Sequence, residues 1–207
     1  MGFQTLDEAR AQALVCTKCR LASGRTQVVW MDGSPTADLM FIGEAPGFHE
    51  DRQGLPFVGA AGQLLDTLLG SIGLDRSQCC IVNVIKCRPP GNRDPLPDEI
   101  EACRPYLDAQ MQFIRPRVVV TLGNFATRFV LARPVSISRV RGQRFQAYGA
   151  TVIPTFHPAA VLHGGGAASP AMTALREDFG LIRQVLNVAV ESVSAPEEHP
   201  SEQQALF

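Results

Sequence analysis

The stretch GEAPGFHEDRQGLPFVGAAGQLL, residues 43–65, indicates the fold most directly, because it connects a predicted strand to a predicted helix. The apolar run ADLMFIG before it, residues 37–43, ends at a glycine and predicts a buried strand. Residues 61–73, AGQLLDTLLGSIG, carry apolar side chains at helical spacing. The loop therefore leaves the carboxyl end of a strand, where ligands bind in open α/β sheets.

This loop also carries unusual chemistry for a connecting segment. Its glycines allow the backbone to approach a ligand closely. Its charged and aromatic side chains are Glu44, Glu50, Asp51 and Phe57. A carboxylate beside a flat apolar ring indicates a planar, polar substrate.

The rest of the chain alternates predicted strands and helices. Further strands are expected at 79–85 and 117–123, with a hairpin at 143–154. Helices are expected at 6–15, 98–113, from residue 124 onward and at 171–190. This alternation predicts an α/β sandwich with a largely parallel sheet.

Length and composition predict a single domain over residues 1–190. A chain of 207 residues with 45% hydrophobic content can bury one sizeable core. No apolar run approaches a membrane span, and the first residues lack the apolar core of a signal peptide. We therefore expect a monomer in the cytoplasm or nucleoid without membrane association, and a disordered acidic tail over 191–207.

The net charge of −1 argues against a uniformly basic nucleic-acid binder. Charge is unevenly distributed, however, since residues 109–175 contain no acidic side chain. The arginines of that segment are Arg115, Arg117, Arg128, Arg133, Arg139, Arg141 and Arg144. They can form a local positive surface for a polyanion, or they can solvate helix faces in an arginine-rich chain. Charge alone does not choose between these interpretations.

Four of the six cysteines have the pattern of a metal site: Cys16, Cys19, Cys87 and Cys103. The first two form a C-x-x-C pair, and four thiolates can hold zinc or an iron-sulfur cluster. A lone redox pair is the alternative, which leaves the two downstream cysteines unexplained. Cys79 and Cys80 lie in a predicted apolar strand and are interpreted as core residues.

Further candidate site residues lie at or after the ends of the other predicted strands, at Asn83, at Gly123 with Asn124, and at His157. Singly, each has an ordinary structural explanation as a turn cap or a hydrogen-bonded histidine. Together with the motifs GEAPG, PFVG, C-x-x-C, KCRPP and HPA, their order strongly resembles the family 4 uracil-DNA glycosylases over residues 16–162.

The resemblance implies a three-layer sandwich around a central, mostly parallel four-stranded sheet. It also implies hydrolysis of the N-glycosidic bond of uracil in single- or double-stranded DNA, which leaves an abasic site and starts base excision repair. A structural 4Fe-4S cluster would be held by Cys16, Cys19, Cys87 and Cys103. The substrate pocket would contain Gly43, Glu44, Ala45, Gly47, Phe57, Asn83 and His157.

By similarity, Phe57 would lie against the uracil ring and Asn83 would read its edge. His157 would donate a hydrogen bond to uracil O2, where negative charge develops. Relatives with the motif GQDPY carry an Asp and a Tyr where this chain has Ala45 and Gly47. We therefore expect Glu44 or Glu50 to orient the water, and we expect Glu44 to help exclude thymine.

DNA contacts are expected from two further groups of residues. Val161 and Leu162 can wedge into the gap left by a flipped base, or they can pack in the core at a helix start. Arg139, Arg141 and Arg144 are candidates for phosphate contacts.

The last five residues resemble the Q-x-x-L-F peptides with which bacterial repair and replication proteins bind the sliding clamp. Gln203, Leu206 and Phe207 would be the anchors of that peptide. An end without a partner is the alternative.

Two competing functions are weighed against the glycosylase. A uracil-binding relative that attaches covalently to DNA carries GEQPG and KRRIH, and this sequence has neither. A non-enzymatic, metal-stabilised DNA-binding or polymerase-associated module would also account for the cysteines and arginines.

Overall fold

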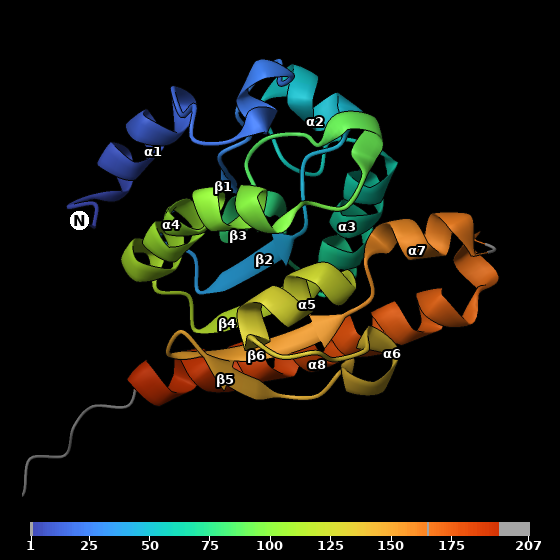
Figure 1. Ribbon diagram of the computed structural model, residues 1–207. Coiled ribbons are helices and arrows are strands. Elements are labelled where there is room, and N and C mark those ends of the chain that lie inside the picture. Colours follow the sequence, from blue (N-terminus) through green and yellow to red (C-terminus); the bar gives the residue numbers. More distant parts are fainter. Residues whose placement is uncertain (1, 165, 195–207) are drawn as a thin grey trace, which may run out of the picture.

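The apolar segments pair into one sheet in the computed structural model, which describes residues 2–164 and 166–194 (Figure 1). The described strands are β1 (Asp32–Gly33), β2 (Leu39–Gly43), β3 (Cys79–Asn83), β4 (Val118–Leu122), β5 (Phe145–Ala147) and β6 (Ala150–Thr155). Their order across the six-stranded sheet is β1-β3-β2-β4-β6-β5. The four inner strands β3, β2, β4 and β6 run parallel, whereas β1 and β5 pair antiparallel at the edges. The predicted four-stranded parallel centre is confirmed, and two short edge strands extend it.

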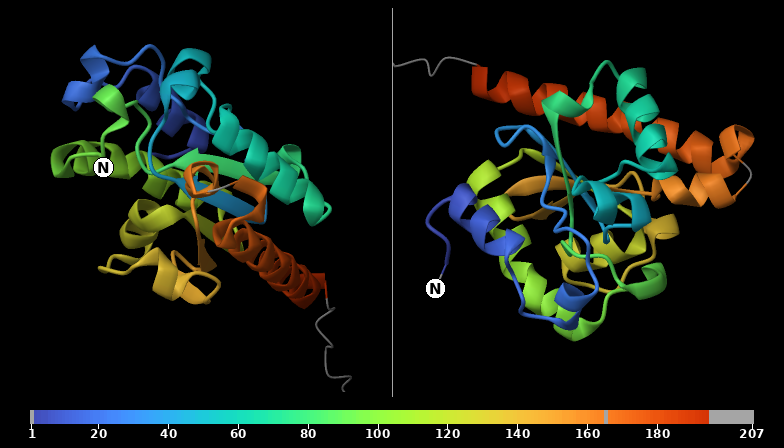
Figure 2. Two further views of the ribbon diagram at one scale, coloured as in Figure 1. Left: turned by 90° about the vertical axis from the view of Figure 1, so that its right-hand side faces the viewer. Right: turned by 90° about the horizontal axis from the view of Figure 1, so that it is seen from above.

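Helices cover both faces of this sheet (Figure 2). The described α-helices are α1 (Leu6–Leu14), α2 (Phe48–Gln53), α3 (Ala60–Ser71), α4 (Pro97–Ile114), α5 (Gly123–Leu131), α6 (Ile137–Val140), α7 (Pro158–His163) and α8 (Pro170–Ser194). Short 3₁₀ turns lie at η1 (Arg20–Ser23), η2 (Arg76–Gln78), η3 (Pro90–Asn92) and η4 (Gly166–Ala168). This arrangement confirms the three-layer α/β sandwich.

Successive side chains of β2 point to opposite faces of the sheet, so the core has two halves. Met40 and Ile42 belong to the cluster that includes buried residues of α1, α4 and α5. Leu39 and Phe41 belong to the cluster that includes α3 and α8, where the Phe41 ring stacks on Phe179. Because both faces are covered, every residue of β2 is buried, and the strand is an uninterrupted apolar run.

The structure departs from the sequence prediction at two elements. The segment predicted as a loop after β2 contains the short helix α2, which begins after Gly47 and ends at Gly54, a residue with φ 73°. A helix of six residues is too short to show apolar periodicity. Helix α8 continues to Ser194, beyond the end predicted for this helix at residue 190. The predicted clamp peptide with Gln203, Leu206 and Phe207 lies outside the described residues.

An internal ion pair ties α8 to the sheet. Arg141 follows α6, and its Nη2 lies 2.8 Å from Oδ1 of Asp178 and 2.6 Å from the backbone oxygen of Ala174 in α8. The Asp178 carboxylate is buried and also accepts a hydrogen bond from Thr155 Oγ1 in β6, at 2.6 Å. Arg141 is therefore engaged inside the fold, which does not favour its predicted role in phosphate binding.

None of the described helices has the length and apolar character that crossing a bilayer requires.

Replacement of Arg141 should destabilise the fold. Arg141→Ala leaves the buried Asp178 carboxylate without its cation, so the free energy of unfolding should fall by about 3 kcal/mol. Arg139→Ala is the matched control, because Arg139 is exposed and its loss should change stability by less than about 0.5 kcal/mol. Urea unfolding followed by circular dichroism measures both. Equal stability of the two variants would contradict the structural role of Arg141.

Candidate active site

The carboxyl ends of three parallel strands meet at one cavity. Gly43 ends β2 in register with Asn83, which ends β3, and His157 follows β6. The cavity has a volume of about 700 Å³. Of the residues predicted from the sequence, Glu44, Ala45, Gly47, Glu50, Phe57, Asn83 and His157 line it. Residues separated by more than 100 positions in the chain are thus brought together as expected for an open α/β sheet.

Asn83 is the clearest sign of a ligand at this cavity. Its side chain is only 2% exposed, and its Oδ1 is the sole buried side-chain nitrogen or oxygen without a hydrogen-bond partner among the described residues. An unsatisfied buried acceptor costs about 1 to 3 kcal/mol, so such atoms are rare unless a ligand or water completes them. The cavity therefore presents an acceptor that fits a ligand N–H group.

Gly43 makes this placement of Asn83 possible. A Cβ atom at Gly43 would collide with Asn83 Oδ1 and would lie 2.6 Å from Cζ of the Phe57 ring. The absence of a side chain at the end of β2 therefore lets the amide and the ring approach the same strand end. The sequence predicted that this glycine lets the backbone approach a ligand. In the structure it makes room for the side chains of Asn83 and Phe57.

The Phe57 ring lines the cavity beside His157. The two rings stack with centroids 5.5 Å apart and planes inclined by 27°. Phe57 adopts φ 54°, a left-handed conformation that costs a non-glycine residue about 1 to 3 kcal/mol. The neighbouring structure must therefore hold this backbone in place.

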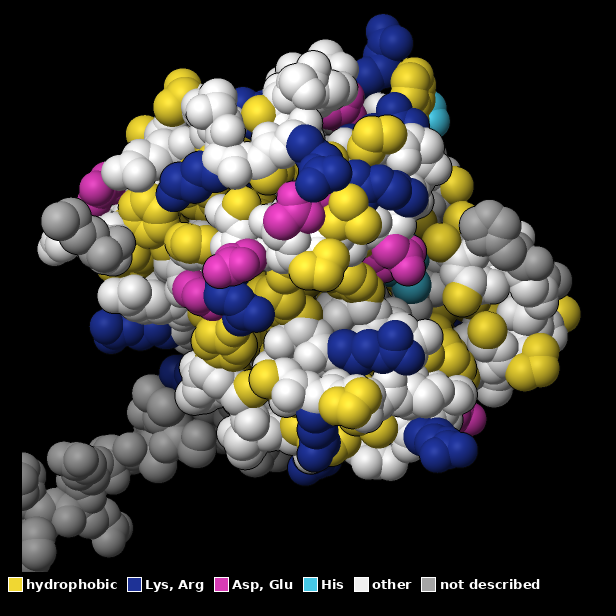
Figure 3. Space-filling model, in the orientation of Figure 1, with side chains coloured by type: hydrophobic (Ala, Val, Ile, Leu, Met, Phe, Trp, Pro, Cys, Tyr) yellow, Lys and Arg dark blue, Asp and Glu magenta, His cyan; other side chains and the backbone are white. Residues whose placement is uncertain are grey.

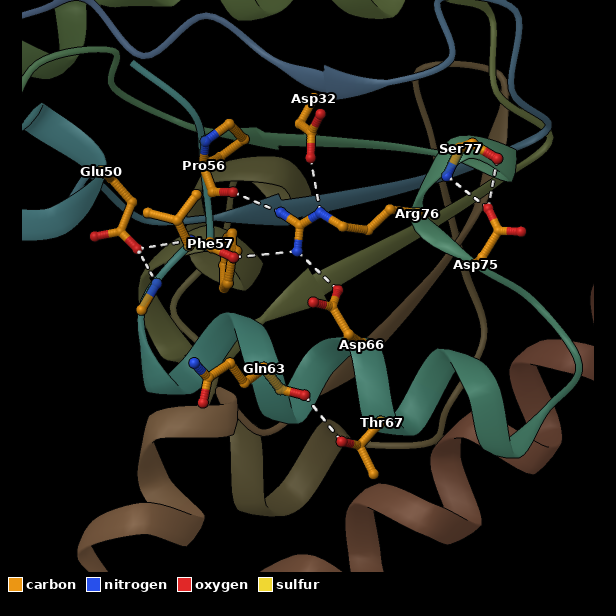
Figure 4. Close-up of polar contacts among 12 residues, drawn as sticks. Asp32, Glu50, Pro56, Phe57, Gln63, Asp66, Thr67, Asp75, Arg76 and Ser77 are labelled. Atoms are coloured by element: carbon orange, nitrogen blue, oxygen red, sulfur yellow. Dashed lines mark hydrogen bonds and ion pairs between the residues drawn. The ribbon is translucent and has the colours of Figure 1, made fainter. Parts of the chain in front are cut away.

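Arg76, in the 3₁₀ turn η2, supplies one side of that support (Figure 4). Its Nη2 donates to the Pro56 carbonyl at 2.6 Å, and its Nη1 donates to the Phe57 carbonyl at 3.1 Å. Asp32 and Asp66 bind the same guanidinium at 2.7 and 2.8 Å. Sequence reasoning missed Arg76, because a single arginine before a strand has no motif that distinguishes it.

Glu50 supports the segment from the opposite side (Figure 4). Its Oε1 accepts hydrogen bonds from the backbone nitrogens of Val58 and Gly59 at 2.9 and 3.0 Å. A Cβ at Gly47 would lie 2.7 Å from its other oxygen, Oε2. Glu50 thus holds the backbone of residues 58 and 59. Of the two carboxylates predicted to activate water, Glu44 is the one without such a structural role.

Glu44 has the electrostatics of a titratable catalytic carboxylate. Its side chain makes no hydrogen bond to another described residue. Burial, reinforced by the negative charge of Asp94, raises the pKa of Glu44 to about 7. Both protonation states are therefore accessible near neutral pH, which suits proton transfer.

Burial shifts the pKa of His157 in the other direction from that of Glu44. Burial lowers the pKa of His157 to about 4, although the nearby Glu50 opposes this shift. Its Nδ1 accepts a hydrogen bond from the Ala159 backbone nitrogen at 3.1 Å, so the neutral ring carries its proton on Nε2. His157 is thus a neutral hydrogen-bond donor at neutral pH.

Comparison with known proteins identifies the family of this chain. The family model described as the uracil DNA glycosylase superfamily matches residues 30–179. The chain belongs to this superfamily. The family resemblance expected from the sequence motifs is confirmed, and the matched residues include those that line the cavity at the strand ends.

Relatives within the superfamily place the chain more closely. A type-4 uracil-DNA glycosylase of Sulfurisphaera tokodaii is 44% identical over 88% of this chain and 86% of its own length. Proteins of the same name from Saccharolobus solfataricus and Archaeoglobus fulgidus are 42% and 46% identical. They cover 89% and 78% of this chain, and 88% and 85% of their own lengths. The chain is therefore similar to type-4 members over most of its length.

Away from the cavity at the strand ends, the four cysteines predicted as ligands line a second, smaller cavity between α1, α4 and the segment after β3. Arg25 Nη1 lies 3.6 Å from Cys87 Sγ, and the Lys86 backbone nitrogen lies 3.2 Å from Cys103 Sγ. Among the described residues, no three His, Cys, Asp or Glu side chains form a group that could hold one metal ion. Cys79 and Cys80 are fully buried in β3, as expected for core residues.

Some of the residues predicted to bind DNA are exposed in the structure, and others are engaged or buried inside the fold. Arg139 and Arg144 are exposed, whereas Arg141 binds Asp178 internally. Val161 is 2% exposed and packs in the core, while Leu162 is 47% exposed. Leu162 alone of that pair is accessible to DNA, because consecutive residues of α7 point to different sides.

Proposed function

We propose that this protein is a uracil-DNA glycosylase, a hydrolase that cleaves the N-glycosidic bond of uracil in single- or double-stranded DNA and starts base excision repair. The observation that carries the proposal is the unpartnered Oδ1 of Asn83 beside Phe57 and His157. A glycosylase extrudes its nucleotide from the base stack and reads the base in a pocket. Membership of the superfamily and similarity to type-4 members support this function.

Asn83 would select uracil by its edge. The Oδ1 acceptor suits uracil N3–H, and the amide nitrogen of the same group can donate to O4. Cytosine has an acceptor at N3 and a donor at C4, so it would leave both groups mismatched. A site built on buried hydrogen bonds can reject such a base by roughly 10⁴-fold or more.

His157 would stabilise the departing base. As the C1′–N1 bond breaks, its electron pair moves to uracil, where O2 gains negative charge, and the sugar gains oxocarbenium character. The Nε2–H group of neutral His157 can donate to that oxygen without first losing or gaining a proton. Preorganised donors of this kind contribute about 10² to 10³ in rate.

Glu44 would orient the water that attacks C1′ and accept the proton that the water releases. Ala45 has no carboxylate, and Gly47 has no side chain. Glu50 is occupied, because it holds the backbone of residues 58 and 59. Glu44 is therefore the acidic residue of this cavity whose side chain makes no hydrogen bond to another described residue. The same side chain would narrow the cavity against the thymine methyl group.

We also propose that Cys16, Cys19, Cys87 and Cys103 hold a 4Fe-4S cluster. The donors fit, because four sulfurs face one cavity, and N–H groups of Arg25 and Lys86 lie within 3.6 Å of two of them. When bound, the cluster would cross-link α1, α4 and the segment after β3.

Docking to a sliding clamp through Gln203, Leu206 and Phe207 is proposed on the sequence resemblance alone. The monomeric state also stays a prediction.

The proposed activity is tested directly with uracil-containing oligonucleotides. The protein should cleave single- and double-stranded DNA at uracil after alkali treatment. Asn83→Ala should lower the single-turnover rate by about 10²-fold or more, because it removes the edge-reading amide. Asn187→Ala, at an exposed position of α8, is the matched control and should keep the full rate. Lack of cleavage by the wild-type protein would contradict the proposal and favour a non-enzymatic DNA-binding module.

The role of Glu44 predicts a defined pH profile. If ionised Glu44 accepts the proton, the single-turnover rate should rise with pH through a midpoint of about 7 and then level off. Asp94→Asn should move this midpoint to lower pH, since it removes a charge that raises the Glu44 pKa. Glu44→Gln should abolish the rise and lower the rate by about 10²-fold. His157 stays neutral above about pH 4, so its titration should cause no further change of the rate in this pH range. Full activity of both Glu44→Gln and Glu50→Gln would refute a carboxylate-assisted mechanism.

The proposed cluster predicts a coloured iron protein. The purified protein should carry about four iron atoms, and Cys103→Ala should lose most of the iron and visible absorbance together with a lower melting temperature. Cys80→Ala, in the buried strand β3, is the control and should retain iron. Stoichiometric zinc in a colourless protein would contradict the cluster.

A further inference from the structure

An exposed aromatic side chain stands at the mouth of the candidate active site. Phe48 is the first residue of α2, lines the cavity and is 46% exposed. Two guanidinium groups lie on its ring, since Cζ of Arg52 is 5.6 Å and Cζ of Arg88 is 5.1 Å from the ring centroid. The segment after β3 and the helix after β2 thus contribute one cation each to a single aromatic platform.

Neither of these arginines forms an ion pair with another described residue. Arg88 uses Nε to bind Asn92 Oδ1 at 2.7 Å, which leaves its two terminal amino groups available. In contrast, Arg93 in the same cavity is held by Glu99 at 2.6 Å. Figure 3 shows Lys and Arg side chains near the top of this face, where α2 lies, as well as further down the same face. The Phe48 platform therefore carries two positive charges that no described residue neutralises in an ion pair.

We propose that Phe48 orders Arg52 and Arg88 as a clamp for phosphates that flank the flipped nucleotide. This inference rests on the proposed function of the cavity as a uracil pocket. A nucleotide in that pocket stays covalently joined to its strand, so its neighbouring phosphates must lie at the cavity mouth. Phosphate oxygens accept paired hydrogen bonds from the planar guanidinium group.

The ring explains why an exposed apolar residue is useful here. Stacking on an aromatic face restricts each arginine before DNA arrives, so less side-chain entropy is lost on binding. The ring is bordered by cations, which attract the negatively charged backbone more strongly than a neutral base. Such contacts position the strand without reading its sequence.

The test compares the salt dependence of DNA binding in full-length variants. The probe is an oligonucleotide with a 2′-fluoro-uridine, which resists cleavage, and fluorescence anisotropy gives Kd over a series of KCl concentrations. Arg52→Ala and Arg88→Ala should each reduce the slope of log Kd against log [KCl] by about 0.9 on duplex DNA. Phe48→Ala should weaken binding about tenfold, reduce the slope and raise KM by a larger factor than it lowers kcat. Phe48→Trp should restore wild-type binding, because it keeps a flat aromatic face.

Arg104→Ala is the matched control. Its guanidinium lies 4.4 Å from the Phe129 ring centroid, and the group also contacts Tyr148 in the turn before β6, at the end of that strand remote from His157. This variant should keep the wild-type Kd and slope. Melting temperatures of all variants check that the exposed substitutions leave the fold intact.

Several results would overturn the clamp. They are an unchanged slope in the Arg52→Ala/Arg88→Ala double variant, an equal change in Arg104→Ala, or weaker binding by Phe48→Ala with an unaltered slope. A wild-type protein that binds the uridine probe no better than the same DNA with thymidine would contradict the uracil pocket instead. The two failures are therefore distinguishable.

Discussion

The candidate active site depends on a backbone segment that is held from two sides. Phe57 is in a left-handed conformation, and the Arg76 guanidinium and the Glu50 carboxylate bind the peptide groups around it. This support fixes the ring against His157 and beside Asn83. Without it, the residues around Phe57 would relax toward ordinary backbone angles, and the cavity would lose its apolar wall.

Burial gives two titratable groups of this cavity different proton states. It lowers the pKa of His157 to about 4 and raises that of Glu44 to about 7. The histidine is thereby kept as a neutral donor, while the carboxylate can change its charge near neutral pH. A neutral donor and a titratable carboxylate are the groups that the proposed cleavage of the glycosidic bond would use, and the exposed Asp94 adds to the shift of the Glu44 pKa.

The strand β3 connects this cavity to the cysteine-lined one. Asn83 ends the strand, and the buried Lys86 donates from Nζ to the Asn83 backbone oxygen at 2.7 Å. The Lys86 backbone nitrogen meanwhile lies 3.2 Å from Cys103 Sγ. A cluster at the cysteines would consequently stabilise the segment that follows Asn83, which would give a metal group a structural purpose in an enzyme whose reaction needs no electron transfer.

The sequence by itself determined the layered α/β fold, because doubly buried strands such as residues 118–122 are continuous apolar runs. It also indicated Phe57, Asn83 and His157, because their motifs occur in an order that resembles the family 4 uracil-DNA glycosylases. Only the tertiary structure separated Glu50 from Glu44, assigned Arg141 to Asp178, and brought Arg76 to the backbone of Phe57. These assignments depend on hydrogen bonds between segments that are distant in the sequence and on which side chains those segments bury. Local spacing in the sequence does not predict either.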